Sequence, residues 1–203
     1  MARRVRSEER KKQLVKAAEE CIAELGLSAL TIREIASRAG MSPGSVLYHY
    51  PETDDLVYDV HRALVNRYVD HRMQAMSRVV DPSRRLVRAF ESGLPSGPED
   101  QICGMLYELH GLATRSKQHA ALMTSLWDRE IMLYESVIDS GLAAKQFRAE
   151  MSARALAEAL LAMEDGLGLH IVSDNGSISV NDALNMLVTT ASVWLKSDLS
   201  KHL

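Results

Sequence analysis

The sequence has few cysteines and no long hydrophobic run. Its two cysteines, Cys21 and Cys103, are too few and too far apart for a disulfide-rich scaffold, which favours a reducing compartment and two buried thiols. No stretch approaches the roughly 18 consecutive apolar residues that a membrane-spanning helix needs, and the first residues are charged rather than apolar. We therefore expect a cytoplasmic protein that is neither secreted nor inserted into a membrane.

Several motifs of common enzyme classes are also missing. The sequence contains no His-Glu-x-x-His, no Cys-x-x-Cys and no glycine-rich phosphate loop. The nearest approach to a metal-binding set is His61, Asp70 and His71, but positions 61 and 71 are ten residues apart on a helix, and the adjacent positions 70 and 71 diverge. We therefore expect no enzymatic activity, no metal and no cofactor.

Positive charge is concentrated at one end of the chain. The net charge of −3 over 203 residues argues by itself against a nucleic-acid partner. Residues 1–50, however, hold nine basic and six acidic groups, a balance of +3, whereas the rest of the chain holds 15 and 21, a balance of −6. Six of the nine basic groups fall within the first twelve residues, which is typical of an arm that neutralises phosphates. A solvated terminus is the simpler interpretation of this arm taken alone.

Helical periodicity dominates the sequence, and no segment alternates in the manner of a β-strand. The pattern predicts an all-α fold of about nine helices without internal repeats. The expected helices cover about 7–25, 32–39, 43–50, 53–76, 82–90, 101–115, 118–140, 152–173 and 180–198. Ser7 is the expected cap of the first helix, and residues 91–100, rich in glycine and proline, form the one clear loop.

Two short helices near the N-terminus have matching start and stop signals. Thr31 followed by Glu34 predicts a capping box, and Gly40 predicts the left-handed residue that ends this helix. Ser42 predicts the cap of a third helix, with Pro43 at its first position. A helix, a glycine-containing turn and a capped short helix are typical of a helix-turn-helix, whose second helix enters the DNA major groove. An ordinary helical hairpin would give the same pattern.

The residues TIREIASRAGMSPGS at 31–45, continuing to YHYP at 48–51, resemble the DNA-binding segment of the TetR family of bacterial repressors. The resemblance extends over roughly the first 65 residues, and the remainder shares the family's all-helical layout and length. It implies a helix-turn-helix DNA-binding domain over 1–52 and a helical ligand-binding and dimerisation domain over 53–203. It also implies that the fourth helix links the two.

The resemblance implies which residues contact DNA. Small residues at the head of the third helix would face base edges and phosphates, Tyr48 and His49 would contact the backbone, and the arm would add electrostatic affinity. The candidate DNA-binding residues are Arg3, Arg4, Arg6, Thr31, Arg33, Ser42, Pro43, Gly44, Ser45, Tyr48 and His49.

Three departures from the family pattern weaken this interpretation. Leu47 stands where the family commonly has an aromatic residue, Pro43 replaces a frequent lysine or polar residue, and Glu52 follows the helix-ending proline where a lysine is common. An alternative function is therefore a helical ligand-binding or interaction protein with weakened or lost DNA binding.

The C-terminal part of the sequence is rich in methionine and aromatic residues, which suit an adaptable small-molecule pocket. The same residues could simply fill a core. The candidate ligand-binding residues are Met105, His110, Met123, Trp127, Tyr134 and Met163. Glu164 and Asp165 could pair with a cationic ligand, although a solvated acidic pair is the simpler interpretation.

The last two predicted helices are long and mostly apolar. Two such helices from each of two subunits would form a four-helix homodimer interface, unless one subunit buries them itself. The candidate interface residues are Leu156, Leu160, Leu167, Leu184, Leu187, Ala191 and Trp194. Together with the resemblance, this pattern implies a regulator, most simply a repressor, that releases a palindromic double-stranded operator when a small apolar or amphipathic effector binds.

Overall fold

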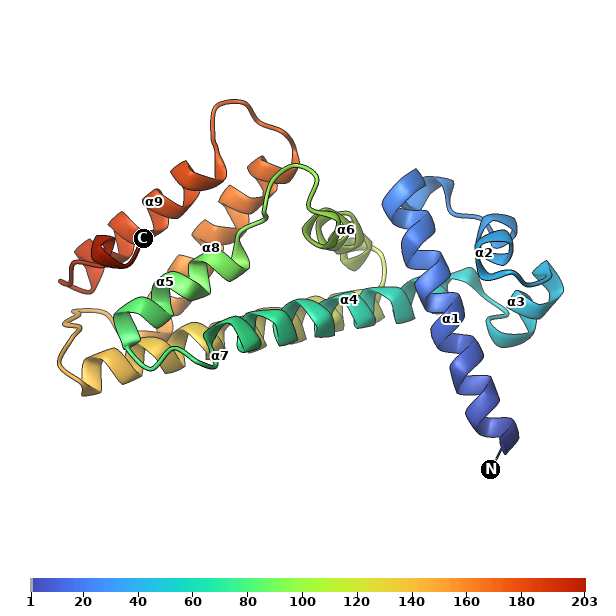
Figure 1. Ribbon diagram of the computed structural model, residues 1–203, viewed down its shortest axis with the longest axis horizontal. Helices are drawn as coiled ribbons and strands as arrows, with labels where there is room; N and C mark the ends of the chain where they lie inside the picture. Colours follow the sequence, from blue (N-terminus) through green and yellow to red (C-terminus); the bar gives the residue numbers. More distant parts are fainter. Residues whose placement is uncertain (1) are drawn as a thin grey trace. The chain divides into compact units, whose positions relative to one another are not determined.

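The computed structural model describes residues 2–203, with side chains from Val5 onward, and this range is helical without a strand (Figure 1). The predicted all-α fold is confirmed. The nine α-helices of the described range are α1 (Ala2–Leu25), α2 (Ile32–Ala39), α3 (Pro43–His49), α4 (Thr53–Met76), α5 (Pro82–Gly93), α6 (Gln101–His110), α7 (Lys117–Ala143), α8 (Ala153–Val172) and α9 (Val180–Trp194). Three short 3-10 helices accompany them: η1 (Leu27–Ala29), η2 (Gly111–Thr114) and η3 (Ser200–His202).

Most predicted boundaries lie within a few residues of the observed ones, and the differences have local causes. Helix α1 begins at Ala2, so Ser7 lies inside the helix rather than capping it. Helix α5 continues to Gly93, three residues into the predicted loop. The predicted helix over 101–115 divides into α6 and η2. Helix α9 ends at Trp194 because Lys196 adopts a left-handed conformation with φ of 49°.

The chain divides into two compact units. The N-terminal unit comprises the residues up to Asn66 together with Met105–Met123, and the C-terminal unit comprises Arg67–Gly104 and Thr124–Leu203. Helices α4, α6 and α7 therefore each contribute residues to both units. In the described residues, no helix combines the length and hydrophobicity that crossing a bilayer requires.

The N-terminal unit is built on the apolar stripe of α1, which packs against α2 and α3. The stripe side chains Leu14, Ala17, Ala18, Cys21 and Ile22 are buried, whereas Leu25, which continues the same spacing, is half exposed at the end of the helix. The turn that follows is tied to α6, because the Leu27 amide donates a 2.8 Å hydrogen bond to Glu108 Oε1.

The C-terminal unit has one continuous apolar core. Its side chains come from α5, α8, α9, the second half of α7 and Met76 at the end of α4. Helix α9 packs against both α8 and α5 (Figure 1), and η3 packs against α5 and α9. The second cysteine, Cys103, is also buried in this unit, so both cysteines are free buried thiols as predicted.

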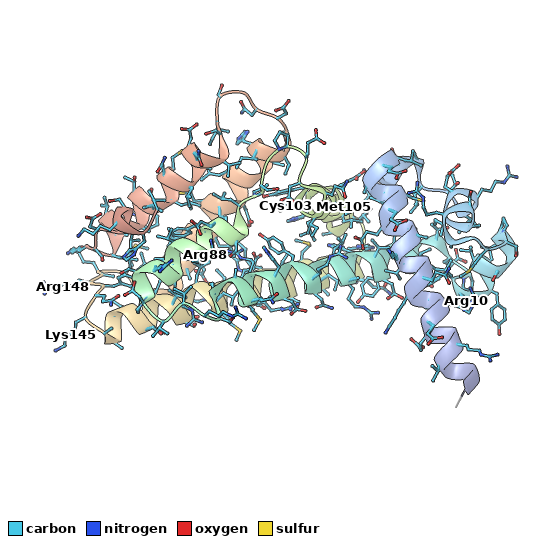
Figure 2. All side chains as sticks on the ribbon, in the orientation of Figure 1. Arg10, Arg88, Cys103, Met105, Lys145 and Arg148 are labelled. Atoms are coloured by element: carbon cyan, nitrogen blue, oxygen red, sulfur yellow. The ribbon has the colours of Figure 1, made fainter. Side chains whose placement is uncertain are left out.

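The end of α7 turns back on itself at a tightly packed glycine. The Gly141 carbonyl accepts hydrogen bonds from the amides of Gln146 (3.0 Å) and Phe147 (3.1 Å), and Lys145 adopts a left-handed φ of 59°. A Cβ on Gly141 would overlap the ring of Phe147, which is itself buried in the core. The segment between α7 and α8 carries Lys145 and Arg148 (Figure 2), and the Arg148 amide donates to the Leu195 carbonyl at 2.8 Å.

Two histidines meet in the interior of the N-terminal unit. His61 on α4 and His119 on α7 are both buried, their Nδ1 atoms lie 2.8 Å apart, and their rings stack at 5.1 Å. One ring must donate and the other accept, so at least the accepting imidazole is neutral. Burial lowers the pKa of His61 to about 4, and the nearby imidazoles of His119 and His110 act in the same direction. Burial also lowers the pKa of His119.

The substitution Gly141→Ala should destabilise the fold. Overpacking against a ring that cannot move costs about 1–3 kcal/mol, and the better helix propensity of alanine returns at most about 1 kcal/mol. We expect a lower free energy of unfolding in urea. The control is Gly104→Ala in α6, where a Cβ meets no atom within 4 Å and the same change should be neutral or stabilising. Equal stability of Gly141→Ala and wild type would contradict the packing described.

The histidine pair should make stability depend on pH in a defined direction. Between the ordinary histidine pKa of about 6.5 and the lowered value of about 4, the unfolded chain binds a proton that folded His61 does not, so the free energy of unfolding falls as the pH falls. Between pH 7 and pH 5 this contribution is about 2 kcal/mol. The measurement is urea unfolding of wild type and His61→Gln at both pH values, and the fall should be smaller in the variant. Parallel pH profiles would rule out a neutral His61.

Candidate functional site

The α2–α3 segment is held by its own caps. Thr31 Oγ1 accepts a 3.2 Å hydrogen bond from the Glu34 amide, and Gly40 ends α2 in the left-handed conformation with φ of 63°. Ser42 Oγ then accepts a 3.2 Å hydrogen bond from the Ser45 amide at the start of α3. The predicted caps of both helices are confirmed. The turn between α2 and α3 is short because Gly40 ends α2 and Ser42, two residues later, already caps α3.

One half of the predicted capping box is missing. The Thr31 side chain caps the Glu34 amide, but among the described contacts the Glu34 carboxylate does not return a bond to the Thr31 amide. That amide therefore stays available at the exposed N-terminus of α2. A free amide at a helix N-terminus is suited to an anion such as a phosphate.

The inner face of this segment fixes the orientation of α3. Ile35, Ala36 and Val46 are buried. Tyr50, which directly follows α3, is 3% exposed, and its hydroxyl donates a 2.8 Å hydrogen bond to Asp59 Oδ2 on α4. Burial and the Asp59 carboxylate raise the pKa of Tyr50 well above its usual range, so the phenol stays protonated as a donor. Sequence reasoning had placed Tyr50 only within the family motif and gave it no role.

The outer face of α3 is small and exposed. Ser42, Pro43 and Gly44 are exposed at its N-terminal end, with Ser45 half-buried. Tyr48 is 72% exposed, and its ring stands edge-on to the half-buried ring of His49, with centroids 5.2 Å apart. Leu47 is 45% exposed and belongs to this outer face.

Basic side chains near this face differ in availability. Arg6 and Arg33 are exposed, while the side chains of Arg3 and Arg4 lie outside the described residues. Arg38 is already engaged, because its guanidinium donates two hydrogen bonds to the Glu24 carboxylate. Of the predicted basic contacts that the structure describes, Arg6 and Arg33 are therefore the exposed ones.

Residues 40–44 also contain the letters Gly-x-Ser-x-Gly of a hydrolase nucleophile elbow. Such an elbow joins a strand to a helix, whereas this segment joins α2 to α3. Ser42 Oγ is committed as the cap of α3. The surroundings fit a helix cap rather than a nucleophile. The described residues also contain no group of three or more His, Cys, Asp or Glu side chains placed to hold a metal.

The six predicted ligand-binding residues fall in both units. Met105 (labelled on α6 in Figure 2), His110 and Met123 belong to the N-terminal unit, where Met105 is buried and His110 is exposed at the end of α6. Trp127, Tyr134 and Met163 belong to the C-terminal unit. Tyr134 is fully buried in the apolar core of this unit, and Trp127 and Met163 are partly buried against that core.

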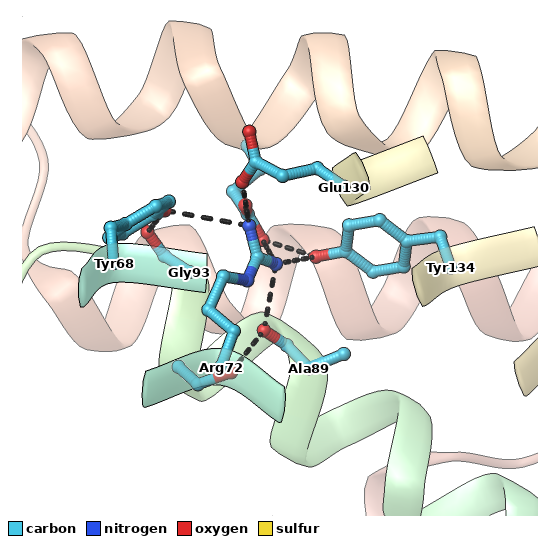
Figure 3. Close-up of polar contacts among 8 residues, drawn as sticks. Tyr68, Arg72, Ala89, Gly93, Glu130 and Tyr134 are labelled. Carbon is cyan, nitrogen blue, oxygen red and sulfur yellow. Dashed lines mark hydrogen bonds and ion pairs between the residues drawn. The ribbon is translucent and has the colours of Figure 1, made fainter. Parts of the chain in front are cut away.

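Tyr134 belongs to a buried charged cluster centred on Arg72, which is fully buried near the end of α4 (Figure 3). Arg72 Nη1 and Nη2 donate to the two carboxylate oxygens of Glu164 on α8 at 2.8 and 3.2 Å. Arg72 Nη1 also contacts Glu130 on α7, and Nη2 donates to the Tyr134 hydroxyl at 3.0 Å and the Ala89 carbonyl at 3.1 Å. One guanidinium thereby joins α4, α5, α7 and α8.

Aromatic rings and a glycine complete this cluster. The guanidinium carbon lies 5.6 Å from the ring centre of Tyr68 and 5.3 Å from that of Tyr134. The Tyr68 hydroxyl donates a 2.9 Å hydrogen bond to the Gly93 carbonyl, and a Cβ on Gly93 would overlap the Glu164 carboxylate. Glycine at this position lets α5 approach the buried acid closely.

The cluster contains more acidic than basic side chains. Two buried carboxyls, Glu130 and Glu164, share one guanidinium. Burial raises the pKa of Glu130 to about 8 against the opposing effect of Arg72, and burial also raises the pKa of Glu164. Arg72 stays charged, because the surrounding carboxylates oppose its desolvation and the pKa remains above its usual value.

Sequence reasoning found part of this cluster. Tyr134 was predicted as a ligand contact and Glu164 as a possible partner for a cation, whereas Arg72 and Glu130 were missed. A signal was present, since Arg72 follows Tyr68 by four residues and so continues the apolar stripe of its helix. A charge that interrupts an apolar stripe must be paired inside the fold.

The predicted dimer residues are mostly core residues of a single chain. Leu156, Leu160, Leu167, Leu187 and Ala191 are at most 8% exposed in the C-terminal core, because α8 and α9 turn these faces towards their own unit. Leu184 and Trp194 are half-buried against the same core. The apolar side chains that α8 and α9 leave exposed are Leu169, Met186 and Val193.

Comparison with known proteins gives two family matches. The family described as bacterial regulatory proteins, tetR family, matches residues 14–60, which include α2 and α3. The family described as BetI-type transcriptional repressor, C-terminal, matches residues 82–193, more than half of the chain.

Alignments with individual relatives cover most of both sequences. The nicotine-responsive transcriptional repressor HdnoR of Paenarthrobacter nicotinovorans is 26% identical over 194 residues, covering 91% of this chain and 95% of the relative. The regulator PksA of Bacillus subtilis is 24% identical over 181 residues, covering 86% and 84%. A transcriptional regulator from Saccharomonospora viridis, solved in complex with choline, superposes with a TM-score of 0.83 at 25% identity, covering 91% of this chain and 96% of that structure. This chain belongs to the TetR family of helix-turn-helix transcriptional regulators.

Proposed function

We propose that this regulator is a repressor that binds a palindromic operator as a homodimer and releases it when a small amphipathic molecule binds its C-terminal part. The division predicted from the sequence, a DNA-binding domain over 1–52 and a ligand-binding and dimerisation domain over 53–203, is part of this proposal.

The exposed head of α3 is the observation that carries the DNA-binding half. Ser42, Pro43 and Gly44 project little beyond the backbone, so the helix end can approach base edges closely. The exposed Tyr48 hydroxyl can donate to a phosphate, which positions the helix without reading sequence. Basic Arg6 and Arg33 supply sequence-independent affinity.

Exposed apolar side chains support a homodimer. Leu169 on α8 is 48% exposed, and Met186 and Val193 on the neighbouring α9 are 46% and 69% exposed. A second copy that covers these residues would be related to the first by a two-fold axis, which is also the symmetry of a palindromic DNA site. A spacing of about 34–36 Å, one DNA turn, matches a palindromic site.

The relatives and the buried cluster together support an organic cation as the effector. One related structure contains choline, and one related repressor is described as nicotine-responsive. Both compounds are amphipathic and carry a cationic nitrogen at neutral pH. In this chain, Glu130 and Glu164 beside the rings of Tyr68 and Tyr134 offer the carboxylates and aromatic faces that bind such a group.

Operator binding can be tested with the full-length protein and the DNA upstream of its own gene, or with duplexes selected from a random library. Tyr48→Phe removes one phosphate hydrogen bond and should weaken binding to every duplex by about five- to tenfold. Arg6→Ala removes one phosphate charge and should lower the slope of log affinity against log salt by about one. Fluorescence anisotropy over a salt series measures both.

The matched control for Arg6→Ala is Arg78→Ala, an exposed arginine beyond α4 that should leave the salt slope unchanged. Equal slopes for Arg6→Ala and wild type would remove the arm from the interface. If no selected duplex binds in a sequence-preferring and salt-sensitive way, the chain is a ligand-binding or interaction protein and the repressor proposal fails.

The effector class can be tested with compounds matched in shape but not in charge. Choline should raise the melting temperature and weaken operator affinity, because it stabilises only the state to which it binds. Its neutral carbon analogue, 3,3-dimethylbutan-1-ol, should do neither at the same concentration. Nicotine and its uncharged analogue cotinine form a second pair. Equal effects of charged and neutral members would reject a cationic effector while leaving operator binding intact.

A further inference from the structure

The buried cluster of the C-terminal unit already holds an organic cation, which is the guanidinium of Arg72. Its carbon lies within 6 Å of the ring centres of both Tyr68 and Tyr134, at 5.6 and 5.3 Å. Two carboxyl groups, from Glu130 and Glu164, contact its nitrogens. We call these four surrounding side chains, from Tyr68, Glu130, Tyr134 and Glu164, the cation cage (Figure 3).

The cage has one more acidic side chain than its occupant requires. A single guanidinium is balanced by one carboxylate, and Glu164 alone engages both of its outer nitrogens at 2.8 and 3.2 Å. Glu130 is a second buried acid at the same cation. A buried carboxyl can stay protonated or can pair with a positive charge, so this second acid lets the cage adjust to a cation other than one guanidinium.

The guanidinium also fits the cage imperfectly. Its two outer nitrogens are fully used, but the buried Arg72 Nε has no hydrogen-bond partner among the described atoms. Leaving a buried donor without a hydrogen-bond partner destabilises the arrangement. A quaternary ammonium has no N–H donors to leave unpaired and would still gain the two ring faces and the carboxylates.

We propose that the cation cage is the site that receives the ammonium group of the effector, and that Arg72 is a built-in occupant which the effector displaces. This inference rests on the proposed effector response and names the site and its competitor. The ligand class is a small quaternary or tertiary ammonium compound of about the width of a guanidinium.

Displacement would reach the DNA-binding side through α4. Arg72 holds α4 to α5 through the Ala89 carbonyl, to α7 through Glu130, and to α8 through Glu164. Helix α4 is continuous from Thr53 to Met76 and starts four residues after α3 ends. An effector that takes over the carboxylates frees α4 from these restraints, and this difference between two states is what regulation requires.

A built-in competitor lowers the apparent affinity for the effector, because only the fraction of molecules with Arg72 displaced can bind. Arg72→Ala removes the competitor and leaves the cage vacant. We expect this variant to melt lower than wild type and to bind choline at least about tenfold more tightly. Tetramethylammonium and methylguanidinium at low millimolar concentration should raise its melting temperature more than they raise that of wild type.

Matched controls separate charge from filling of space. Arg72→Lys keeps a cation in the cage and should gain little affinity for choline. The neutral compound 3,3-dimethylbutan-1-ol should not stabilise Arg72→Ala. If the neutral compound stabilises Arg72→Ala as well as choline does, or if no cation stabilises it more than wild type, the cage assignment is overturned.

Arg72→Ala could fail to fold because it leaves two buried acids without their cation. Arg72→Met, which retains an apolar stem, then replaces it, and refolding yield by circular dichroism is compared with methylguanidinium, with the neutral alcohol and with neither. Cation-specific recovery supports the cage, and no cation-specific recovery overturns it.

Operator binding provides the independent readout. If cations rescue Arg72→Ala but choline leaves the operator affinity of wild type unchanged, the cage stands and the proposed effector response fails. If choline releases the operator from wild type while Arg72→Ala gains no affinity for cations, the effector response stands and the cage inference fails.

Discussion

The organisation of the C-terminal unit depends on one buried guanidinium. Arg72 is fully buried and its contacts reach α5, α7 and α8 from α4. Removing such a group from water costs several kcal/mol, which ion pairing repays only with good geometry and satisfied hydrogen bonds. An apolar residue would give a simpler core at this position. What the charge adds is a directional requirement, because only one arrangement of the four helices brings both carboxylates and the Ala89 carbonyl to the same cation.

The ion pairs of Arg72 with Glu130 and Glu164 differ in kind from the apolar contacts of the surrounding core. The side chains of Phe90, Leu160 and Leu187 are held by shape and exclusion of water, and no small solute can take over their contacts. The buried carboxyls of Glu130 and Glu164 instead interact with their partner through charge, and another cation could in principle supply that charge. On the proposal made above, the C-terminal unit combines an apolar core that resists change with a polar junction where a ligand would substitute for a residue of the chain.

The sequence predicted the structure where the causes are local and missed it where they are distant. Thr31, Gly40 and Ser42 were identified correctly because each acts on backbone groups within four residues. The Arg72 junction escaped prediction because Glu130 and Glu164 are 58 and 92 residues away along the chain. Helical periodicity marks which residues share a face of a helix, and it contains no information about which other helix that face will meet.

The same reasoning explains the outcome for the last two helices. Leu156 and Leu187 lie on strongly apolar faces, and such a pattern is produced equally by burial in one chain and by burial between two. Within one chain these faces are already covered, so the exposed large apolar side chains that α8 and α9 offer to a second copy are the weaker pattern of Leu169, Met186 and Val193. A half-polar outer face suits an assembly whose subunits are each folded before they meet. A regulator that must change the spacing of two DNA-reading helices benefits from such an interface, because its subunits can shift without exposing their cores.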